Sequence, residues 1–330
     1  MSDSSVTTQH TRPRQKAEGT RPARWRRRLL VAAAVLALLL VVLAGNAFEV
    51  NRRTAAASGS SIITIDGQGI NVVQDGPAHA PAVVLVHGLG GSTRWWDPIV
   101  PALAERYHVI RVDLLGFGRS AKPAGDEYSI AEQARRIGAI LDDIGVDQAT
   151  LVGHSTGGYV VSELARERPT LVTGLVLMDT GIFTGEQHMS EAWHRFADFV
   201  ERVDELPVSL LVRRGCATDP GDDVAAAYDA PFPSEASKAG ARAFPAILPL
   251  SPADVGASAG HDVLRAIRAD TRPMLILWGA EDRPIPLPTG EAFADSIGRS
   301  IDHVIDGAGH FLQEDRGPEI GALIADWLAG

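Results

Sequence analysis

The sequence predicts an α/β fold built on a doubly wound, mostly parallel sheet. Continuous apolar runs recur along the chain, as expected of strands buried on both faces, and helical segments such as 130–144 and 159–166 lie between most of them. The pair Asp66-Gly67 after the first run predicts a hairpin. The expected strands are residues 62–65, 70–73, 82–86, 109–112, 150–152, 175–178, 273–277 and 303–305.

Length and cysteine content limit how this fold is held together. The 330 residues are enough for one α/β domain with an insertion. A single cysteine, Cys216, excludes an internal disulfide, so the core alone must stabilise the fold. We expect a structural or incidental role for Cys216, because no glycine-rich turn or strand end surrounds it.

The N-terminal segment has the features of a membrane-targeting sequence. Residues 1–28 contain eight Lys or Arg and two Asp or Glu and predict a disordered, basic cytoplasmic tail. Residues 29–48 are uncharged and would span roughly 30 Å as a helix, enough to cross a bilayer core. One transmembrane anchor would place the body outside the cytoplasm at the cell membrane. The alternative is a cleaved signal sequence and a secreted protein. Residues 49–60 predict a linker.

Charge argues against several classes of function. The formal net charge is −10, and because the basic tail carries +6, the rest carries −16. An acidic body without a basic stripe does not suit nucleic acid. No Cys/His cluster has metal-ligand spacing, and nothing in the chain implies a cofactor or a protein partner.

The alternation of strands and helices stops in the middle of the chain. Residues 181–267 contain amphipathic and Pro-rich pieces but no buried-strand run, and they predict an inserted helical cap. The cap divides the core into residues 61–180 and residues 268–330. We expect it to lie over the strand ends, where ligands bind in open α/β sheets.

A short glycine-rich segment predicts the nucleophile. Gly153-His154-Ser155-Thr156-Gly157-Gly158 follows an apolar strand and precedes a helix. In that context a G-x-S-x-G sequence forms a tight turn that exposes the serine at the N-terminus of the helix. Ser155 is therefore the candidate nucleophile.

A serine hydroxyl needs a base and an acid that orients the base. His310 follows the last expected strand and is the candidate base, and Asp282 follows the strand before it and is the candidate acid. Asp179, after the expected strand 175–178, is the alternative acid. The other nearby histidines, His87 and His154, are expected to be structural.

Negative charge that develops on an attacked carbonyl oxygen needs backbone donors. One is expected to be the N–H of Thr156, directly after the serine. The other is expected to be the N–H of Leu89, in the loop His87-Gly88-Leu89-Gly90-Gly91 that follows an expected strand.

With these motifs placed, residues 62–328 resemble the α/β-hydrolase superfamily. His87-Gly88, the segment 113–120, the serine turn and Gly307-Ala308-Gly309-His310 match its landmarks in order. The superfamily also orders its triad as serine, acid, histidine. The cap and tail look like haloalkane dehalogenases in three stretches. These are Tyr228-Asp229-Ala230-Pro231-Phe232-Pro233, Ala239-Gly240-Ala241-Arg242-Ala243-Phe244-Pro245 and Gly309-His310-Phe311-Leu312-Gln313-Glu314-Asp315.

The chain departs from the dehalogenases at the nucleophile. That family uses aspartate where this chain has Ser155 and usually tryptophan where it has Thr156. A serine that displaced a halide would form an ether, which the same residues cannot hydrolyse. We therefore expect a carboxylesterase-like serine hydrolase that acts on a small or medium-sized apolar ester. The alternatives are a dehalogenase-like or epoxide hydrolase-like enzyme, a carbon–carbon bond hydrolase or perhydrolase, and a non-catalytic binding protein.

Overall fold

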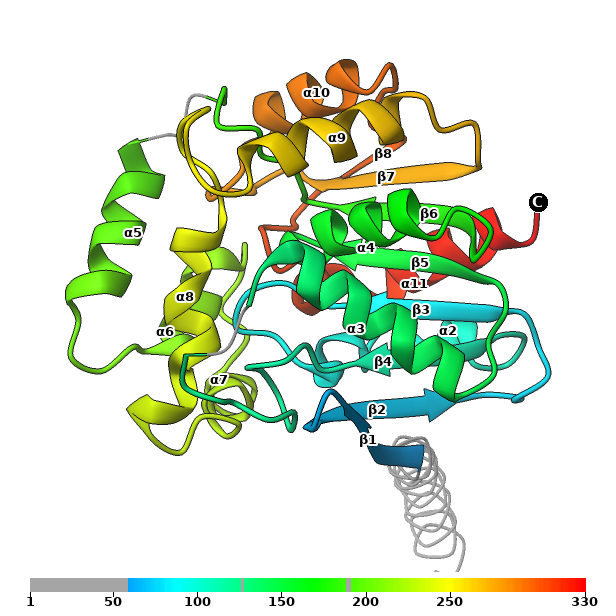
Figure 1. Cartoon of the computed structure of the whole chain (residues 1–330), viewed down its shortest axis with the longest axis horizontal. Helices are drawn as coiled ribbons and strands as arrows, with labels where there is room; N and C mark the ends of the chain where they lie inside the picture. Colours follow the sequence, from blue (N-terminus) through cyan, green and yellow to red (C-terminus); the bar gives the residue numbers. More distant parts are fainter. Residues whose placement is uncertain (1–58, 126–127, 188–190) are drawn as a thin grey trace, which may run out of the picture. The chain divides into compact units, whose positions relative to one another are not determined.

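Eight strands form one sheet in the order β1-β2-β4-β3-β5-β6-β7-β8 (Figure 1). This computed structural model describes residues 59–125, 128–187 and 191–330. Only the β1–β2 and β2–β4 pairs are antiparallel, which confirms the mostly parallel sheet. The strands are β1 (Ser60–Ile65), β2 (Gln68–Asp75), β3 (Ala82–Val86), β4 (His108–Val112), β5 (Ala149–His154), β6 (Val172–Met178), β7 (Met274–Gly279) and β8 (His303–Ile305).

The first two strands form the expected hairpin. Asp66 and Gly67 both have positive φ angles, 51° and 78°. Two consecutive residues in that region make the two-residue turn whose twist matches the flanking strands. The hairpin prediction is therefore confirmed.

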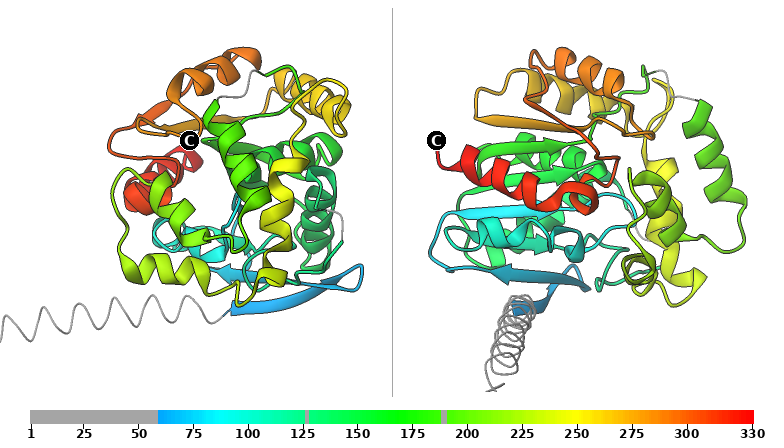
Figure 2. Two further views of the ribbon diagram at one scale, coloured as in Figure 1. Left: turned by 90° about the vertical axis from the view of Figure 1, so that its left-hand side faces the viewer. Right: turned by 180° about the vertical axis from the view of Figure 1, so that it is seen from behind.

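Helices cover both faces of the sheet. The helices of the described residues, including those beyond the ends of the strands, are α2 (Val100–Leu103), α3 (Ile130–Asp143), α4 (Thr156–Glu167), α5 (Glu191–Arg202), α6 (Val208–Gly215), α7 (Asp222–Asp229), α8 (Ala239–Ile247), α9 (Ala257–Arg268), α10 (Leu287–Ser296) and α11 (Leu312–Leu328). Two short 3₁₀ helices are η2 (Thr93–Trp96) and η3 (Glu235–Lys238). Helices α3 and α4 cover one face, and α11 lies on the opposite face, seen from behind in Figure 2.

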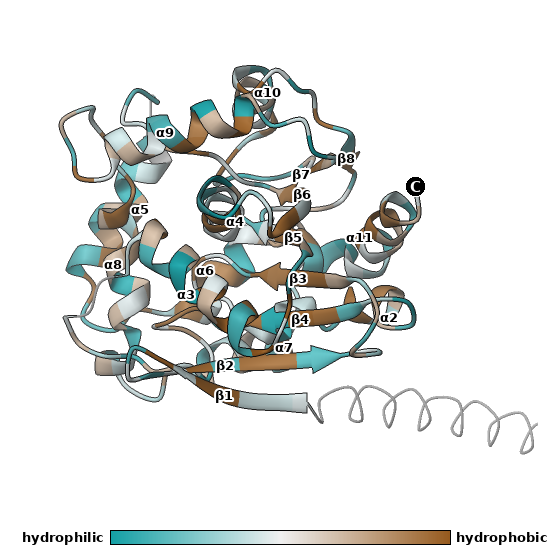
Figure 3. Cartoon of the chain, turned by 45° about the vertical axis from the view of Figure 1, so that its right-hand side comes forward, coloured by the Kyte–Doolittle hydropathy of each residue, from teal (hydrophilic) through white to brown (hydrophobic). Residues whose placement is uncertain are grey.

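The continuous apolar runs follow from this two-sided cover. Successive residues of β3 enter different parts of the core: Val84 and Val86 pack on the α3 and α4 side, and Val83 and Leu85 on the α2 and α11 side. Side chains alternate along a strand, so a strand covered on both faces must be apolar at every position. Figure 3 shows this concentration of hydrophobic residues on the central strands.

The chain between β6 and β7 is helical in its described part. Helices α5 to α8 lie beyond the carboxyl end of the sheet (Figures 1 and 2). A Cβ on Gly240 of α8 would lie 2.9 Å from the Cα of Gly116, which follows β4. Helix α8 therefore packs directly on the loop that follows β4. Helix α9 packs instead on α4, where Gly260 approaches Tyr159.

The predicted N-terminal segments lie outside the described residues. They are the tail 1–28, the anchor or signal 29–48 and the linker 49–60 up to residue 58. Within residues 59–125, 128–187 and 191–330, no helix combines the length and the apolar character that a membrane crossing requires.

Candidate active site

Ser155 occupies a strained turn between β5 and α4. Its φ and ψ angles are 53° and −125°, an unusual conformation for a residue other than glycine. A Cβ on Gly157 would lie 2.2 Å from the carbonyl oxygen of Val86, and one on Gly153 would lie 2.5 Å from the backbone of Gly157. The turn can form only because these positions are glycine, and it has the geometry of a nucleophile elbow.

The three residues expected to form a triad are joined by two successive hydrogen bonds. The Nε2 of His310 lies 3.0 Å from the Oγ of Ser155, and its Nδ1 lies 2.7 Å from Oδ2 of Asp282. An ionised carboxylate only accepts, so Nδ1–H donates to Asp282 and Nε2 is left to accept the Ser155 hydroxyl. All three are buried, with 8%, 8% and 4% exposure for Ser155, His310 and Asp282. This arrangement can move a proton from Ser155, or from a water beside it, to His310.

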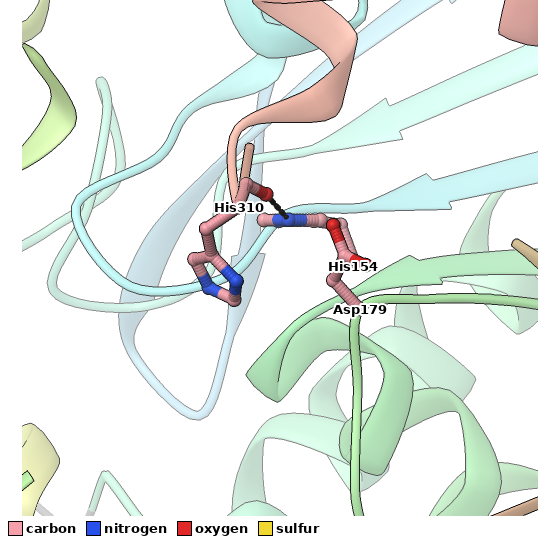
Figure 4. A group of neighbouring side chains, drawn as sticks. All are labelled: His154, Asp179 and His310. Carbon is pink, nitrogen blue, oxygen red and sulfur yellow. Dashed lines mark hydrogen bonds between the residues drawn. The ribbon is translucent and has the colours of Figure 1, made fainter. Parts of the chain in front are cut away.

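The backbone of His310 is held from two sides. Its N–H donates to the carbonyl oxygen of Gly215 at 2.7 Å, and its carbonyl oxygen accepts from Nε2–H of His154 at 2.6 Å (Figure 4). His154 is fully buried, and burial together with His310 holds its pKa well below the usual range. His154 is therefore a neutral donor that fixes the position of His310.

Two buried carboxyl groups compete for the role of the acid. Asp282 bonds His310 and also accepts from the N–H of Ile285 at 2.7 Å. Asp179 accepts from the N–H of Gly279 at 2.8 Å, while its Oδ2 has no hydrogen-bond partner among the described residues. Burial and the neighbouring Asp282 raise the pKa of Asp179 well above 3.8. The geometry thus pairs His310 with Asp282, and Asp179 lies beside that pair with a carboxyl pKa raised by burial and by Asp282.

The loop after β3 lies against Ser155. A Cβ on Gly88 would be 2.8 Å from the Cβ of Ser155, which leaves room there only for glycine. His87 shapes the loop: its Nδ1 donates to the carbonyl oxygen of Gly88 at 2.7 Å, and its Nε2 accepts from the N–H of Leu114 at 3.0 Å. Burial lowers the pKa of His87, so it is neutral. Leu89 and Thr156 both line the space beside Ser155.

One group of side chains has metal-ligand chemistry. A ring nitrogen of His154, a ring nitrogen of His310 and a carboxylate oxygen of Asp179 lie within 4.8 Å of one another. Both ring nitrogens of His310 and Nε2 of His154 already take part in hydrogen bonds. A metal there would have to break the contacts that join Ser155, His310 and Asp282.

A large cavity opens onto Ser155 and His310. Its volume is about 640 Å³, and its wall is mostly apolar. Helices α5, α6 and α8 supply much of that wall, through residues such as Phe196, Leu211 and Phe244. A pocket of this kind suits a small or medium-sized apolar molecule.

Two residues that hold the site were not found from sequence. Thr180 donates its hydroxyl to the carbonyl oxygen of Ser155 at 2.5 Å, and Gly215 supplies the carbonyl that accepts from His310. The position of Thr180 directly after β6, beside the alternative acid, was a usable signal. Gly215 contributes only backbone, and no side-chain pattern marks it.

Comparisons with known proteins agree with this fold. The family model described as "alpha/beta hydrolase fold" matches residues 81–209. A haloalkane dehalogenase of Mycobacterium marinum is 30% identical over 266 residues, covering 78% of this chain and 88% of the relative. A haloalkane dehalogenase of Mesorhizobium japonicum is 31% identical over 300 residues, covering 83% and 92%.

Solved structures are similar over nearly their whole length. The crystal structure of a haloalkane dehalogenase from Bradyrhizobium elkani matches with a TM-score of 0.71 and 26% identity, covering 82% of this chain and 98% of the other. An alpha/beta hydrolase fold protein from Burkholderia ambifaria matches with a TM-score of 0.68 and 28% identity, covering 82% and 97%.

The predicted carboxylesterase-like function is wrong by these comparisons. It rested on two positions, Ser155 and Thr156, whereas the similarity to haloalkane dehalogenases extends over at least three quarters of the chain. The comparisons favour the dehalogenase-like alternative.

Proposed function

This chain belongs to the α/β-hydrolase superfamily as a relative of the haloalkane dehalogenases, and from that premise we propose that it is a dehalogenase-like hydrolase of a small or medium-sized apolar molecule. The observation that carries the proposal is the apolar cavity of about 640 Å³ with Ser155 and His310 in its wall. The names of the relatives support a haloalkane as the substrate class.

Dehalogenation in this chain must follow a different route from dehalogenation by an aspartate nucleophile. Direct attack by Ser155 on a halogenated carbon would leave an ether, which has no carbonyl carbon for water to attack. We propose instead that Ser155 holds a water and that Nε2 of His310 takes its proton. The water oxygen bonds to carbon as the carbon–halogen bond breaks, giving an alcohol, a halide ion and one proton on His310. Asp282 stabilises the charged imidazole.

Leu89 and Thr156 would stabilise the negative charge that develops on the departing halide. Their backbone N–H groups are proposed to face the departing halide, and the Thr156 amide lies at the N-terminus of α4, where anions are favoured. The helical segment 181–267 is proposed to act as a cap that keeps bulk water from the cavity.

A second candidate is carbon–carbon bond hydrolysis next to a ketone. The observation that favours it is the 3.0 Å separation between Oγ of Ser155 and Nε2 of His310, which suits a serine nucleophile. Ser155 would attack the ketone carbon and His310 would take the hydroxyl proton. As the carbon–carbon bond breaks, His310 would return that proton to the leaving carbon. Water would then release the acyl group from Ser155.

One set of variants tests both candidates. Purified protein is incubated with 1-bromohexane and, separately, with an aliphatic 1,3-diketone, and halide release and diketone loss are followed. In the dehalogenase-like route His310→Ala abolishes halide release, while Ser155→Ala retains part of it because water remains the nucleophile. In the carbon–carbon route Ser155→Ala abolishes diketone loss. Wild-type protein that is folded but releases no halide from any of a set of haloalkanes would overturn the first proposal.

Localisation remains a proposal from sequence. We propose that residues 29–48, which lie outside the described residues, hold the catalytic body on the outer side of the cell membrane. Cleavage of this segment and secretion is the alternative. Fractionation of cells and protease treatment of intact cells test it: protein that stays in the cytoplasmic fraction contradicts both versions.

A further inference from the structure

The titratable groups in the cavity wall are nearly all positive. Besides His310, the wall contains Arg195, Arg214 and Arg283. No Asp, Glu or Lys belongs to the wall within the part of the chain that the structure describes. This is unexpected for a protein of formal net charge −10, whose acidic residues outnumber its basic ones 41 to 31.

Two of these arginines have no acidic partner. Arg195 pairs with Glu191 at 3.1 Å, one turn away on α5. Arg214 and Arg283 form no ion pair or side-chain hydrogen bond with any residue in 59–125, 128–187 or 191–330, and both are exposed. Arg213, the neighbour of Arg214, behaves differently: it pairs with Asp219 and Asp222 and does not line the cavity.

The two unpaired arginines line the same cavity as Ser155 and His310, and each is next in sequence to a residue that bonds His310. Arg283 directly follows Asp282, the partner of His310. Arg214 directly precedes Gly215, whose carbonyl accepts from the N–H of His310 at 2.7 Å. Two segments far apart in sequence, the end of α6 and the loop after β7, thus each contribute one arginine to the wall of the same apolar cavity.

We propose that the substrate is an apolar molecule with a carboxylate group and that Arg214 and Arg283 bind this group. A guanidinium presents parallel N–H donors that match the two oxygens of a carboxylate, and it keeps its charge at any physiological pH. The apolar wall packs the rest of the molecule. Within the proposed function, the substrate class narrows from any haloalkane to an apolar acid such as a halogenated carboxylic acid.

Equilibrium binding tests this inference without relying on turnover. The full chain is titrated by calorimetry with octanoate and with 1-octanol, which share an apolar chain of similar length and differ in charge. The variants are Arg214→Gln, Arg283→Gln and both together. Arg213→Gln is the matched control, since it lies on the same helix and has no place in the cavity wall. Thermal unfolding of each variant shows whether it is folded.

Octanoate is expected to bind wild-type protein about tenfold more tightly than 1-octanol, as two partly solvated charge pairs allow. Each single variant should lose part of that preference, the double variant should lose all of it, and Arg213→Gln should keep it. Raising the salt concentration should weaken octanoate binding and leave 1-octanol unchanged. Equal binding of the two ligands, or a preference that survives in the folded double variant, would overturn the inference.

The test is separable from that of the proposed function. If the wild type prefers octanoate but releases no halide from any haloalkane, the proposal of a carboxylate-bearing ligand is supported and the proposal of dehalogenation is rejected. If halide is released but octanoate binds no more tightly than 1-octanol, the proposal of dehalogenation is supported and the proposal of a carboxylate group on the substrate is rejected. For comparison, Arg195→Gln should change octanoate binding less than Arg214→Gln, because Arg195 already pairs with Glu191.

Discussion

His154 donates a hydrogen bond of 2.6 Å from Nε2 to the backbone carbonyl oxygen of His310. The residue before Ser155 therefore fixes the backbone of the residue that faces Ser155, across 156 positions of sequence. Because the contact goes to backbone, it positions the His310 ring without competing for its nitrogens. The expectation that His154 is structural agrees with this geometry.

Replacing His154 should impair both turnover and stability. His154→Leu leaves the buried carbonyl of His310 without a partner, which costs about 1–3 kcal/mol. His154→Gln retains a donor and should recover part of both losses. Chemical denaturation gives the free energy of unfolding, and kcat measured against pH separates positioning from folding. If His154→Leu unfolds like the wild type and keeps full kcat, the contact has no positioning role.

Replacing each of the two acids in turn by asparagine should identify the acid that supports His310 in catalysis. Asp282→Asn replaces the carboxylate at 2.7 Å from Nδ1 by an uncharged amide, which no longer fixes the tautomer of His310, and should lower kcat by roughly 10⁴-fold. Asp179→Asn should change kcat by less than about tenfold, because no bond joins Asp179 to His310. Steady-state kinetics of the two folded variants decide the matter. The reverse order of effects would assign the acid to Asp179.

Asp179 should also make stability depend on pH. Burial raises its pKa in the folded protein well above 3.8, so the folded state keeps a proton that the unfolded state releases. Its contribution to stability is therefore complete below pH 3.8 and falls, by up to about 1.4 kcal/mol per pH unit, until the folded pKa is reached. Asp179→Asn should remove this fall. Urea denaturation from pH 4 to pH 8 measures it, and parallel curves for variant and wild type would contradict it.

A carboxylate at the nucleophile position should change the route of dehalogenation. Ser155→Asp supplies the residue type that the dehalogenases use, and attack on a bromoalkane would then leave an alkyl ester that His310-activated water can cleave. We expect halide release on the order of tenfold faster than in the wild type. In Ser155→Asp/His310→Ala the alkyl adduct should accumulate and be visible by intact-protein mass spectrometry. Ser155→Asn, which lacks the charged nucleophile, is the control; an equal rate from it would refute the explanation.

The elbow should tolerate no side chain at Gly157. Gly157→Ala places a Cβ 2.2 Å from the carbonyl oxygen of Val86 and should cost at least about 3 kcal/mol or prevent folding. Gly138→Ala on α3 is the matched control. Its Cβ would meet only flexible side chains, at 3.3 Å or more, and alanine favours a helix by about 1 kcal/mol over glycine. Differential scanning calorimetry compares the two, and similar melting temperatures would contradict the argument.

Much of the fold could be predicted because its causes are local. Apolar runs such as Ala82–Val86 predicted strands covered on both faces, and Asp66-Gly67 predicted the hairpin. The order of Ser155, Asp282 and His310 along the chain, each after a strand, predicted residues that the structure brings within hydrogen-bonding distance. Their catalytic roles stay predictions until the variants are measured.

The function was harder to predict, and the reason is physical. Ser155 limits which covalent intermediates can be hydrolysed, and this limit, with Thr156 in place of the usual tryptophan, led to the carboxylesterase interpretation that the comparisons overturn. What a cavity binds depends on its whole wall, and the wall here is assembled from segments between residues 89 and 311. No local sequence pattern predicts which of these segments meet to form the cavity wall.

Short-range patterns of apolar residues, glycines and strand ends were enough to predict the sheet, the serine turn and the set of candidate groups, because each of these features depends on residues that are close in sequence. The contact between His310 and Asp282, rather than Asp179, is visible only in the folded chain, because the two acids follow neighbouring parallel strands and their carboxyl groups face different partners. The tertiary structure alone brought Arg214 and Arg283 to one cavity and set the carbonyl of Gly215 against His310. These contacts join residues far apart in sequence, and their distances exist only once the chain has folded.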